Sequence, residues 1–110
     1  MRSDRARLQD ILAAIDRIEQ ETRSGKAQFL NDAKTQIWVL YHLQTIGEAS
    51  RSLSTEFRVR HDDPTWAKAI GLRNILVHHY FEIDADIIWE IVERDLPPFR
   101  ALVEACLTAF

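Results

Sequence analysis

Residues 31–53 read NDAKTQIWVLYHLQTIGEASRSL, and their pattern predicts the long central helix of an all-α protein. Asn31 or Asp32 can accept hydrogen bonds from the free amides at the start of this helix. Its apolar side chains recur every three or four residues, and neighbouring ones widen the apolar surface enough for packing on two sides. These side chains belong to Ile37, Trp38, Val39, Leu40, Leu43, Ile46 and Leu53. We therefore expect the other helices to pack around residues 31–53.

Gly47 is the unusual residue of this helix, because glycine in a helix interior lowers helix propensity by about 1 kcal/mol relative to alanine. A close crossing by another helix, or the close approach of another group, would explain why glycine stands there.

Two more helices are predicted from apolar spacing and capping signals. The first carries an apolar stripe at Leu8, Ile11, Leu12, Ile15 and Ile18, and it should end near Gly25. After an irregular segment at residues 50–66, Asp63 and Pro64 are a typical N-cap and first helical residue, and this helix should reach about His79. Its expected core face consists of Leu72, Ile75, Leu76 and His79.

The last part of the chain predicts two further helices. Residues 83–84 open one of them, with a buried edge at Ile87, Ile88, Ile91 and Val92. Asp95 can cap a final helix that holds Pro97 and Pro98 in its first turn, so the two prolines mark a kink or a new start. The alternation of β-branched residues that is typical of strands does not occur, so we expect an all-α, compact up-and-down bundle of about five helices.

Length and composition favour one domain over residues 1–110, with 46% apolar and 28% charged residues. The net charge of −3 argues against binding nucleic acid through a general positive field, so such a role would need a local cationic site. The first ten residues carry charges of both signs and no signal-peptide core, and no stretch approaches the roughly 18 apolar residues of a membrane span. We expect a cytoplasmic protein without a membrane association.

Several kinds of site lack support in the sequence. Adjacent histidines on a helix, such as His78 and His79, point about 100° apart, and no HExxH or CxxC spacing occurs, so we expect no metal. Phosphate-binding glycine loops and a serine nucleophile turn are missing too, so we expect no cofactor. The lone Cys106 falls in an apolar series and is interpreted as a core residue.

The stretch GLRNILVHHYFEID, residues 71–84, gathers polar groups beside apolar ones. Arg73 offers a fork of donors suited to phosphate, and His78 can exchange protons near neutral pH. On an ideal helix these two side chains lie about 140° apart, so they converge only if the helix ends near His78 or if a second chain completes the site. A surface ion pair and a partly buried imidazole would explain the same residues.

The segment RNILVHHY, residues 73–80, resembles the R-x4-H-x-Y motif of HepT-like toxins in the HEPN superfamily. The similarity extends in order and spacing through the segments DILAAIDRIEQ, TIGEASRSLS, WAKAIGLRN and YFEIDADIIWEIVERDLPPF. The resemblance implies a HEPN-like helical bundle that dimerises and serves as the toxin of a type VII-like toxin-antitoxin system. Such a toxin would be a metal-independent endoribonuclease, with the R-x4-H motifs of two chains meeting in a cleft.

The resemblance also assigns roles to single residues. Arg73 would bind the phosphate and stabilise the transition state, His78 would be the general acid or base, and Asn74 would support them. Tyr80 would accept AMP from a cognate MntA-like nucleotidyltransferase antitoxin, which would block the RNA site by charge and bulk. The homodimer would then join the antitoxin in a larger hetero-oligomer.

Other residues keep two interpretations. Glu48 either faces the cleft, where it pairs with Arg73 or tunes His78, or it pairs with Arg51 on a solvated surface. Many relatives carry a basic residue in the central helix where this chain has Tyr41 and His42. The cationic contribution to RNA binding would then fall on Arg51, Arg58 and Arg60, unless these three belong to a solvated loop.

The sequence is also compatible with two alternatives to a ribonuclease. The first is a non-catalytic binding module that docks a nucleotidyltransferase partner or presents it with a nucleotide. The second is a purely structural helical dimer.

Overall fold

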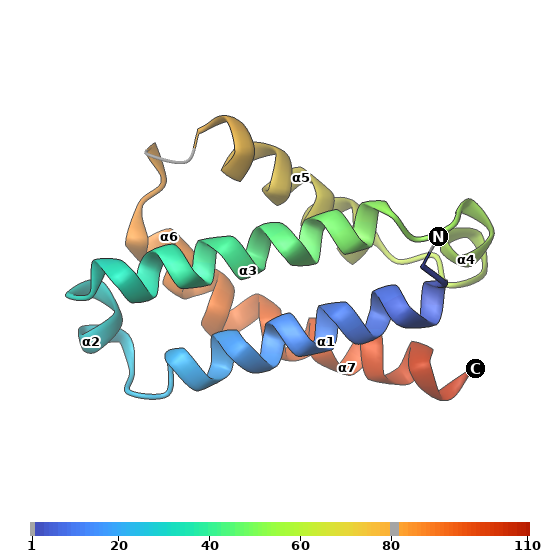
Figure 1. The fold of residues 1–110 in the computed structure, drawn as a ribbon, viewed down its shortest axis with the longest axis horizontal. Helices are drawn as coiled ribbons and strands as arrows, with labels where there is room; N and C mark the ends of the chain where they lie inside the picture. Colours follow the sequence, from blue (N-terminus) through green and yellow to red (C-terminus); the bar gives the residue numbers. More distant parts are fainter. Residues whose placement is uncertain (1, 80–81) are drawn as a thin grey trace.

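The computed structural model describes residues 2–79 and 82–110, and in these ranges the protein is built from helices without a strand. The helices are α1 (Asp4–Glu21), α2 (Lys26–Leu30), α3 (Ala33–Arg51), α4 (Thr55–Arg60), α5 (Pro64–His78), α6 (Ala85–Glu90), the π-helical segment η2 (Ile91–Asp95) and α7 (Leu96–Thr108). Figure 1 shows α3 between α1 and α5, with α7 along α1. The all-α fold and the central position of residues 31–53 are confirmed.

The hydrophobic core lies between α3, α1 and the C-terminal helices. Val39, Leu43 and Ile46 of α3 are at most 3% exposed, and the predicted stripe of α1 is buried at Leu8, Ile11, Ile15 and Ile18. Helices α1 and α5 pack against two opposite flanks of α3. The side of α3 between these flanks that faces away from the core is open to solvent. Ile37, Trp38 and Tyr41 lie on this open side and are 54%, 42% and 63% exposed.

Aspartate caps begin the helices that position the site. Asp32, rather than Asn31, caps α3, since its carboxylate accepts hydrogen bonds from the Lys34 and Thr35 amides. The Asp63 carboxylate accepts from the Thr65 amide and hydroxyl at the start of α5. These hydrogen bonds stabilise the ionised carboxylate, so the Thr65 side chain first and its amide second lower the pKa of Asp63.

Two short helices, α2 and α4, were not predicted. Each is anchored by one phenylalanine in the core, Phe29 in α2 and Phe57 in α4. Gly25, expected at the end of the first helix, instead precedes α2 with a φ of 97°, a left-handed conformation that glycine adopts without a steric penalty. Helices of five or six residues are too short to display an apolar period, so pattern alone does not reveal them.

The C-terminal third departs from the prediction at Asp95. This residue makes no side-chain capping hydrogen bond, and the helix that begins at Ala85 continues through the π-helical segment η2 into α7. The rings of Pro97 and Pro98 lack an N–H and would clash with the carbonyls of residues 93 and 94 in a regular α-helix. The wider π turn over Ile91–Asp95 accommodates both prolines without ending the helix.

The predicted core face of α5 is wrong at two positions. Leu76 is 1% exposed and Leu72 is half-buried, but Ile75 is 52% exposed and His79 lies on the surface. Figure 1 shows the reason, because the C-terminal end of α5 rises away from α3 and leaves the bundle. Ile87, expected in the buried edge of the next helix, is likewise 55% exposed.

Cys106 is buried in α7, as predicted, and burial raises the pKa of its thiol.

Candidate functional site at the crossing of α3 and α5

The site begins where α5 crosses α3 at Gly47. A Cβ atom on Gly47 would lie 2.2 Å from the Cβ of Arg73 and 2.7 Å from the carbonyl oxygen of Ala69. Both atoms belong to the rigid part of α5 rather than to the end of a mobile side chain. The glycine therefore permits the close crossing that its position predicted, and this crossing fixes the base of the Arg73 side chain against α3.

Three polar groups meet at this crossing. Arg73 Nε lies 3.0 Å from Glu48 Oε2 in an ion pair, and Arg73 Nη1 donates a hydrogen bond to Asn74 Oδ1 at 3.2 Å. Nε is buried and makes no aligned hydrogen bond, so its contact with Glu48 is mainly electrostatic. Of the two pairings expected for Glu48, the structure forms the one with Arg73. Within the described ranges, Nη2 of Arg73 has no hydrogen bond or ion pair.

The ion pair holds the arginine in place more than it stabilises the fold. The Arg73 side chain is 20% exposed and the Glu48 side chain 50% exposed. Ion pairs that are this accessible to solvent contribute about 1 kcal/mol or less. The consequence is a guanidinium held at the surface in one orientation, with Glu48 on one side and Asn74 on the other.

His78 is the last residue of α5 and is exposed. Five residues after Arg73, it lies about 7.5 Å further along an ideal helix, and no hydrogen bond or ion pair joins the two side chains. His79 does not pack in the core as predicted: its Nδ1 lies 3.3 Å from Glu82 Oε2 on the surface. Tyr80, the expected AMP acceptor, lies outside the described residues. A single copy of the chain thus places Arg73 and His78 on one helix without bringing them together.

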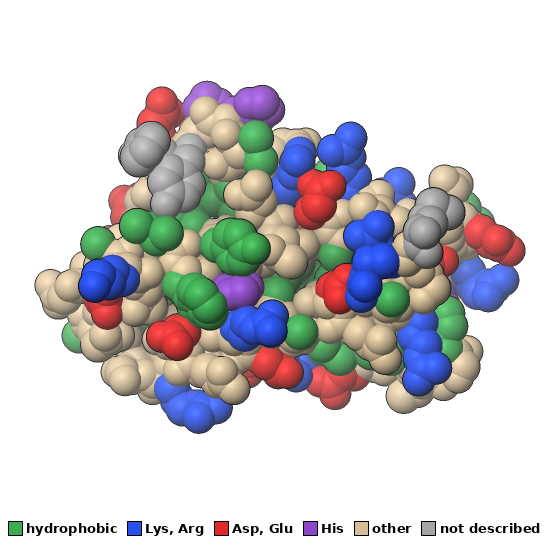
Figure 2. All heavy atoms as spheres, in the orientation of Figure 1, with side chains coloured by type: hydrophobic (Ala, Val, Ile, Leu, Met, Phe, Trp, Pro, Cys, Tyr) green, Lys and Arg blue, Asp and Glu red, His purple; other side chains and the backbone are tan. Residues whose placement is uncertain are grey.

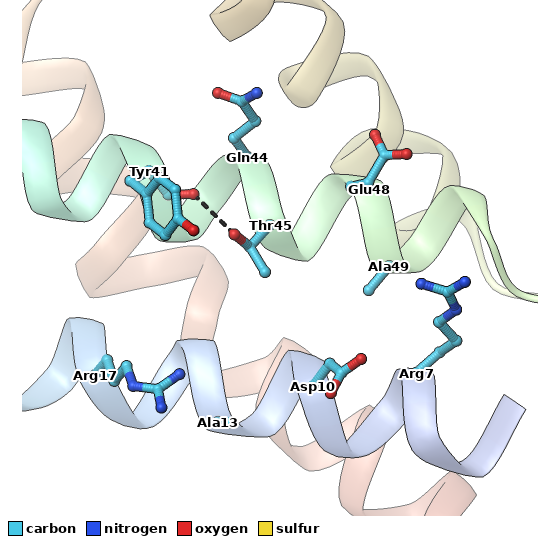
Figure 3. Close-up of a pocket in the computed structure, with 9 residues that line it drawn as sticks. All are labelled: Arg7, Asp10, Ala13, Arg17, Tyr41, Gln44, Thr45, Glu48 and Ala49. Carbon is cyan, nitrogen blue, oxygen red and sulfur yellow. Dashed lines mark hydrogen bonds between the residues drawn. The ribbon is translucent and has the colours of Figure 1, made fainter. Parts of the chain in front are cut away.

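A groove of about 430 Å³ runs beside this site between α1 and α3. Figure 3 shows Arg7, Asp10 and Arg17 along one wall and Tyr41, Gln44, Thr45 and Glu48 along the other. Glu48 therefore belongs both to this groove and to the ion pair with Arg73. Asp10 is engaged elsewhere, since it accepts hydrogen bonds from Nε and Nη2 of Arg2 at 2.9 and 2.8 Å.

His42 lies under the aromatic side chains near this groove. It is 4% exposed, and its ring makes edge contacts with Trp38 and Tyr41 at centroid distances of 4.5 and 5.1 Å. Burial, and then the positive charge of Arg17, lower the pKa of His42, so the imidazole is neutral at pH 7. Neither ring nitrogen has a hydrogen-bond partner among the described residues.

Large apolar side chains remain exposed near the site. Figure 2 shows hydrophobic side chains gathered over the N-terminal half of α3, below the histidines at the end of α5. Exposed apolar residues on these helices and on α6 are Ile37, Trp38, Tyr41, Ile75, Val77 and Ile87. Within the described ranges, no helix is long and apolar enough to cross a membrane, and no group of three or more His, Cys, Asp or Glu side chains is placed to hold a metal ion.

The groove arginines were not predicted from the sequence. Arg7, Asp10, Ala13 and Arg17 recur at helical spacing beside the apolar stripe of α1, which is the signal that places them on one side of that helix. Of the basic residues that were considered instead, Arg60 pairs with Glu56 on α4 and lies outside the groove.

The fold and this arrangement define an all-α protein of the HEPN-like class, with an R-x4-H segment on a helix that crosses a central one. The family model "Ribonuclease HepT-like" matches residues 11–106. The chain belongs to this HepT-like ribonuclease family.

Two relatives match over nearly their whole length. "Putative RNase MJ1380" from Methanocaldococcus jannaschii is 39% identical over 94% of this chain and 95% of its own. "Probable ribonuclease HepT" from Thermococcus cleftensis is 36% identical over 94% of each chain. No solved structure matches the chain.

Proposed function

We propose that this protein is a metal-independent endoribonuclease, the toxin of a type VII-like toxin-antitoxin system, whose site combines Arg73 and His78 from two copies of the chain. Membership of the HepT-like ribonuclease family supports the reaction class. The observation that carries the residue assignment is the crossing at Gly47, which holds Arg73 with Nε and Nη1 engaged by Glu48 and Asn74. Nη2 remains available for a phosphate oxygen.

The proposed reaction is a transfer within the RNA chain. A neutral His78 removes the proton of a 2′-hydroxyl, and the 2′-oxygen forms a bond to the neighbouring phosphorus. The bond from phosphorus to the 5′-oxygen breaks, and the His78 imidazolium formed in the first step gives its proton to this leaving oxygen. The Arg73 guanidinium stabilises the negative charge that accumulates on the phosphate oxygens.

Alanine substitutions test this assignment with a matched control. His78→Ala is expected to slow RNA cleavage by about 10²–10⁴-fold, as for the loss of a general acid or base. Arg73→Ala should slow it by about 10²–10³-fold, as for the loss of one electrostatic stabiliser. His79→Ala removes an adjacent exposed histidine and should keep wild-type activity. Full activity in the Arg73 and His78 variants would contradict the assignment, and an inactive wild type that binds a nucleotidyltransferase would favour a binding module.

Mixing the two inactive variants tests whether the site is shared between chains. A mixed dimer of Arg73→Ala and His78→Ala retains one intact arginine and one intact histidine on different chains. If these converge across the two-fold axis, random mixing should restore up to about a quarter of wild-type activity, because half of the dimers are mixed and each carries one complete site. A mixture as inactive as its components would place both groups of a site on one chain.

The homodimer is supported by exposed apolar side chains that lie beside the half-site and do not line the groove between α1 and α3, such as Ile37 and Ile75. Ile37 on α3 is 54% exposed, so Ile37→Glu should leave the single chain folded but dissociate the dimer. Val59→Glu, on the distant helix α4, introduces the same charge at a 74% exposed position and is the control. Sedimentation velocity at several protein concentrations should give a monomer for the first variant and a dimer for the second. Identical dimers of both variants would exclude this face.

Regulation by a nucleotidyltransferase antitoxin is the remaining part of the proposal, and it rests on the position of Tyr80 in the H-x-Y segment. Co-expression with the cognate enzyme should add the mass of one or more AMP units to the wild type and none to Tyr80→Phe. An unmodified wild type under these conditions would contradict it.

A further inference from the structure

The groove between α1 and α3 has an uncompensated positive charge. It is lined by two arginines, Arg7 and Arg17, and by two carboxylates, Asp10 and Glu48. Each carboxylate already pairs with an arginine that does not line the groove, because Asp10 binds Arg2 and Glu48 binds Arg73. Within residues 2–79 and 82–110, Arg7 and Arg17 make no ion pair of their own.

Arg7 has a further unsatisfied group. Its Nε is buried and has no hydrogen-bond partner among the described residues. This buried Nε is out of reach of a ligand, but Nη1 and Nη2 of the same guanidinium make no hydrogen bond or ion pair with the described residues and can donate to an anion in the groove. Arg7 lies at the end of the groove near Glu48, so such a ligand would adjoin the Arg73 site (Figure 3).

The opposite wall supplies an aromatic surface. Tyr41 is 63% exposed, and its ring is held from below by the edge contact with the buried His42. Gln44 adds an exposed amide that can both donate and accept hydrogen bonds. A cationic wall facing an aromatic side chain is the arrangement with which proteins bind single-stranded nucleic acid, because phosphates meet the cations while bases stack on the ring.

The length of the groove fits a short strand of RNA. Arg7 and Arg17 are ten residues apart on one helix, which corresponds to roughly 15 Å along its axis. A stacked strand advances about 3.4 Å per nucleotide, so the two arginines span roughly four nucleotides.

We propose that this groove binds the single-stranded RNA on one side of the cleaved linkage, with Arg7 and Arg17 on phosphates and Tyr41 stacked against a base. The inference rests on the proposed ribonuclease function and extends it by naming the form of the substrate: a flexible single strand that reaches several nucleotides beyond Arg73. Helix α1, rather than the basic residues of α4, then supplies the cationic contacts to the RNA.

The test measures binding of a fluorescent 12-nucleotide single-stranded RNA in which every 2′-hydroxyl is methylated, so that the wild-type protein cannot cleave it. Fluorescence anisotropy at a series of salt concentrations gives the slope of log affinity against log salt. Each phosphate contact on a single strand contributes about 0.7 to this slope. Arg7→Gln and Arg17→Gln should each lower the slope by about 0.7, and the double variant by about 1.4. Arg5→Gln removes an exposed arginine of α1 outside the groove and should leave the slope unchanged.

The aromatic contact has its own pair of variants. Tyr41→Ala should weaken binding by about 5- to 150-fold, as for the loss of one base stack, whereas Tyr41→Phe should bind like the wild type. Circular dichroism confirms that each variant is folded, and Arg7→Lys, which keeps the charge, should keep the slope.

The outcomes separate the two proposals. If the wild type binds the RNA and the groove variants bind it with the same affinity and slope, the groove inference is overturned while the ribonuclease assignment stands. If the wild type neither binds nor cleaves any RNA, both fail. If a double-stranded RNA of the same sequence binds as tightly and with the same dependence on Tyr41, stacking on a single strand is excluded.

Discussion

Gly47→Ala tests the closeness of the crossing between α3 and α5. The new methyl group would lie 2.2 Å from the Cβ of Arg73 and 2.7 Å from the carbonyl oxygen of Ala69, well inside van der Waals contact. Neither atom can move without the backbone of α5, so the helices must separate. We expect the variant to fold less stably and to displace Arg73 from Glu48.

The expected magnitude follows from two opposing effects. Inserting a methyl group into a packed region costs about 1–3 kcal/mol, and contact with backbone atoms places this case near the upper end. Replacing a helical glycine by alanine returns about 1 kcal/mol of helix propensity. The free energy of unfolding should therefore fall by about 2 kcal/mol.

Gly71→Ala is the matched control, because Gly71 lies in α5 and a Cβ added there meets nothing within 4 Å. This variant gains helix propensity without a clash and should be more stable than the wild type by about 0.5–1 kcal/mol. Urea unfolding followed by circular dichroism, at one protein concentration for all variants, measures both values. A Gly47→Ala protein as stable as Gly71→Ala would refute the reasoning, since the crossing would then have room for a side chain.

Three further variants probe other parts of the molecule. Leu76→Ala should lower the free energy of unfolding by about 2–5 kcal/mol in urea titrations, because Leu76 is 1% exposed and leaves a cavity. His42→Phe should make the free energy of unfolding less sensitive to acid. The folded protein holds the pKa of His42 below 6.5, so the unfolded chain binds a proton more readily. The free energy of unfolding of the wild type therefore falls as the pH drops from 6.5 toward the lower pKa of the folded state. Unfolding at about pH 7.5 and about pH 5.5 should show a smaller difference in the variant. Glu48→Gln should change stability by less than about 1 kcal/mol yet slow RNA cleavage, and equal cleavage rates would exclude a positioning role.

The central helix could be predicted from the sequence because its apolar period is long and an aspartate caps its start. The same reasoning placed Gly47 at a close crossing, because a glycine inside a helical pattern is a local signal that a sequence displays directly. The pairing of Glu48 with Arg73 was one of two alternatives and came from the family resemblance, whereas local spacing alone favoured Arg51.

The predictions that were wrong, and the groove that was not predicted, depend on how the helices pack against one another. Periodicity assigns Ile75 and His79 to a face of α5 but does not say how far that helix remains in contact with α3. The groove depends on the rotation of α1 relative to α3, which brings Arg17 near Tyr41 although no motif links them. The π turn left no distinctive signal: Ile88, Val92 and Leu96 follow at steps of four residues, a spacing that a regular α-helix also places on one face.

The contact of Gly47 with Arg73 also means that Arg73 and His78 differ in when their side chains lose conformational entropy. An arginine side chain carries about 2 kcal/mol of rotamer entropy. Because its base is packed against α3 and its head is held by Glu48 and Asn74, much of this entropy is lost once, when the chain folds. His78, exposed at the end of its helix, keeps its rotamers until something orders it. The arginine is thus preorganised within a single chain, whereas the exposed histidine at the end of α5 is not.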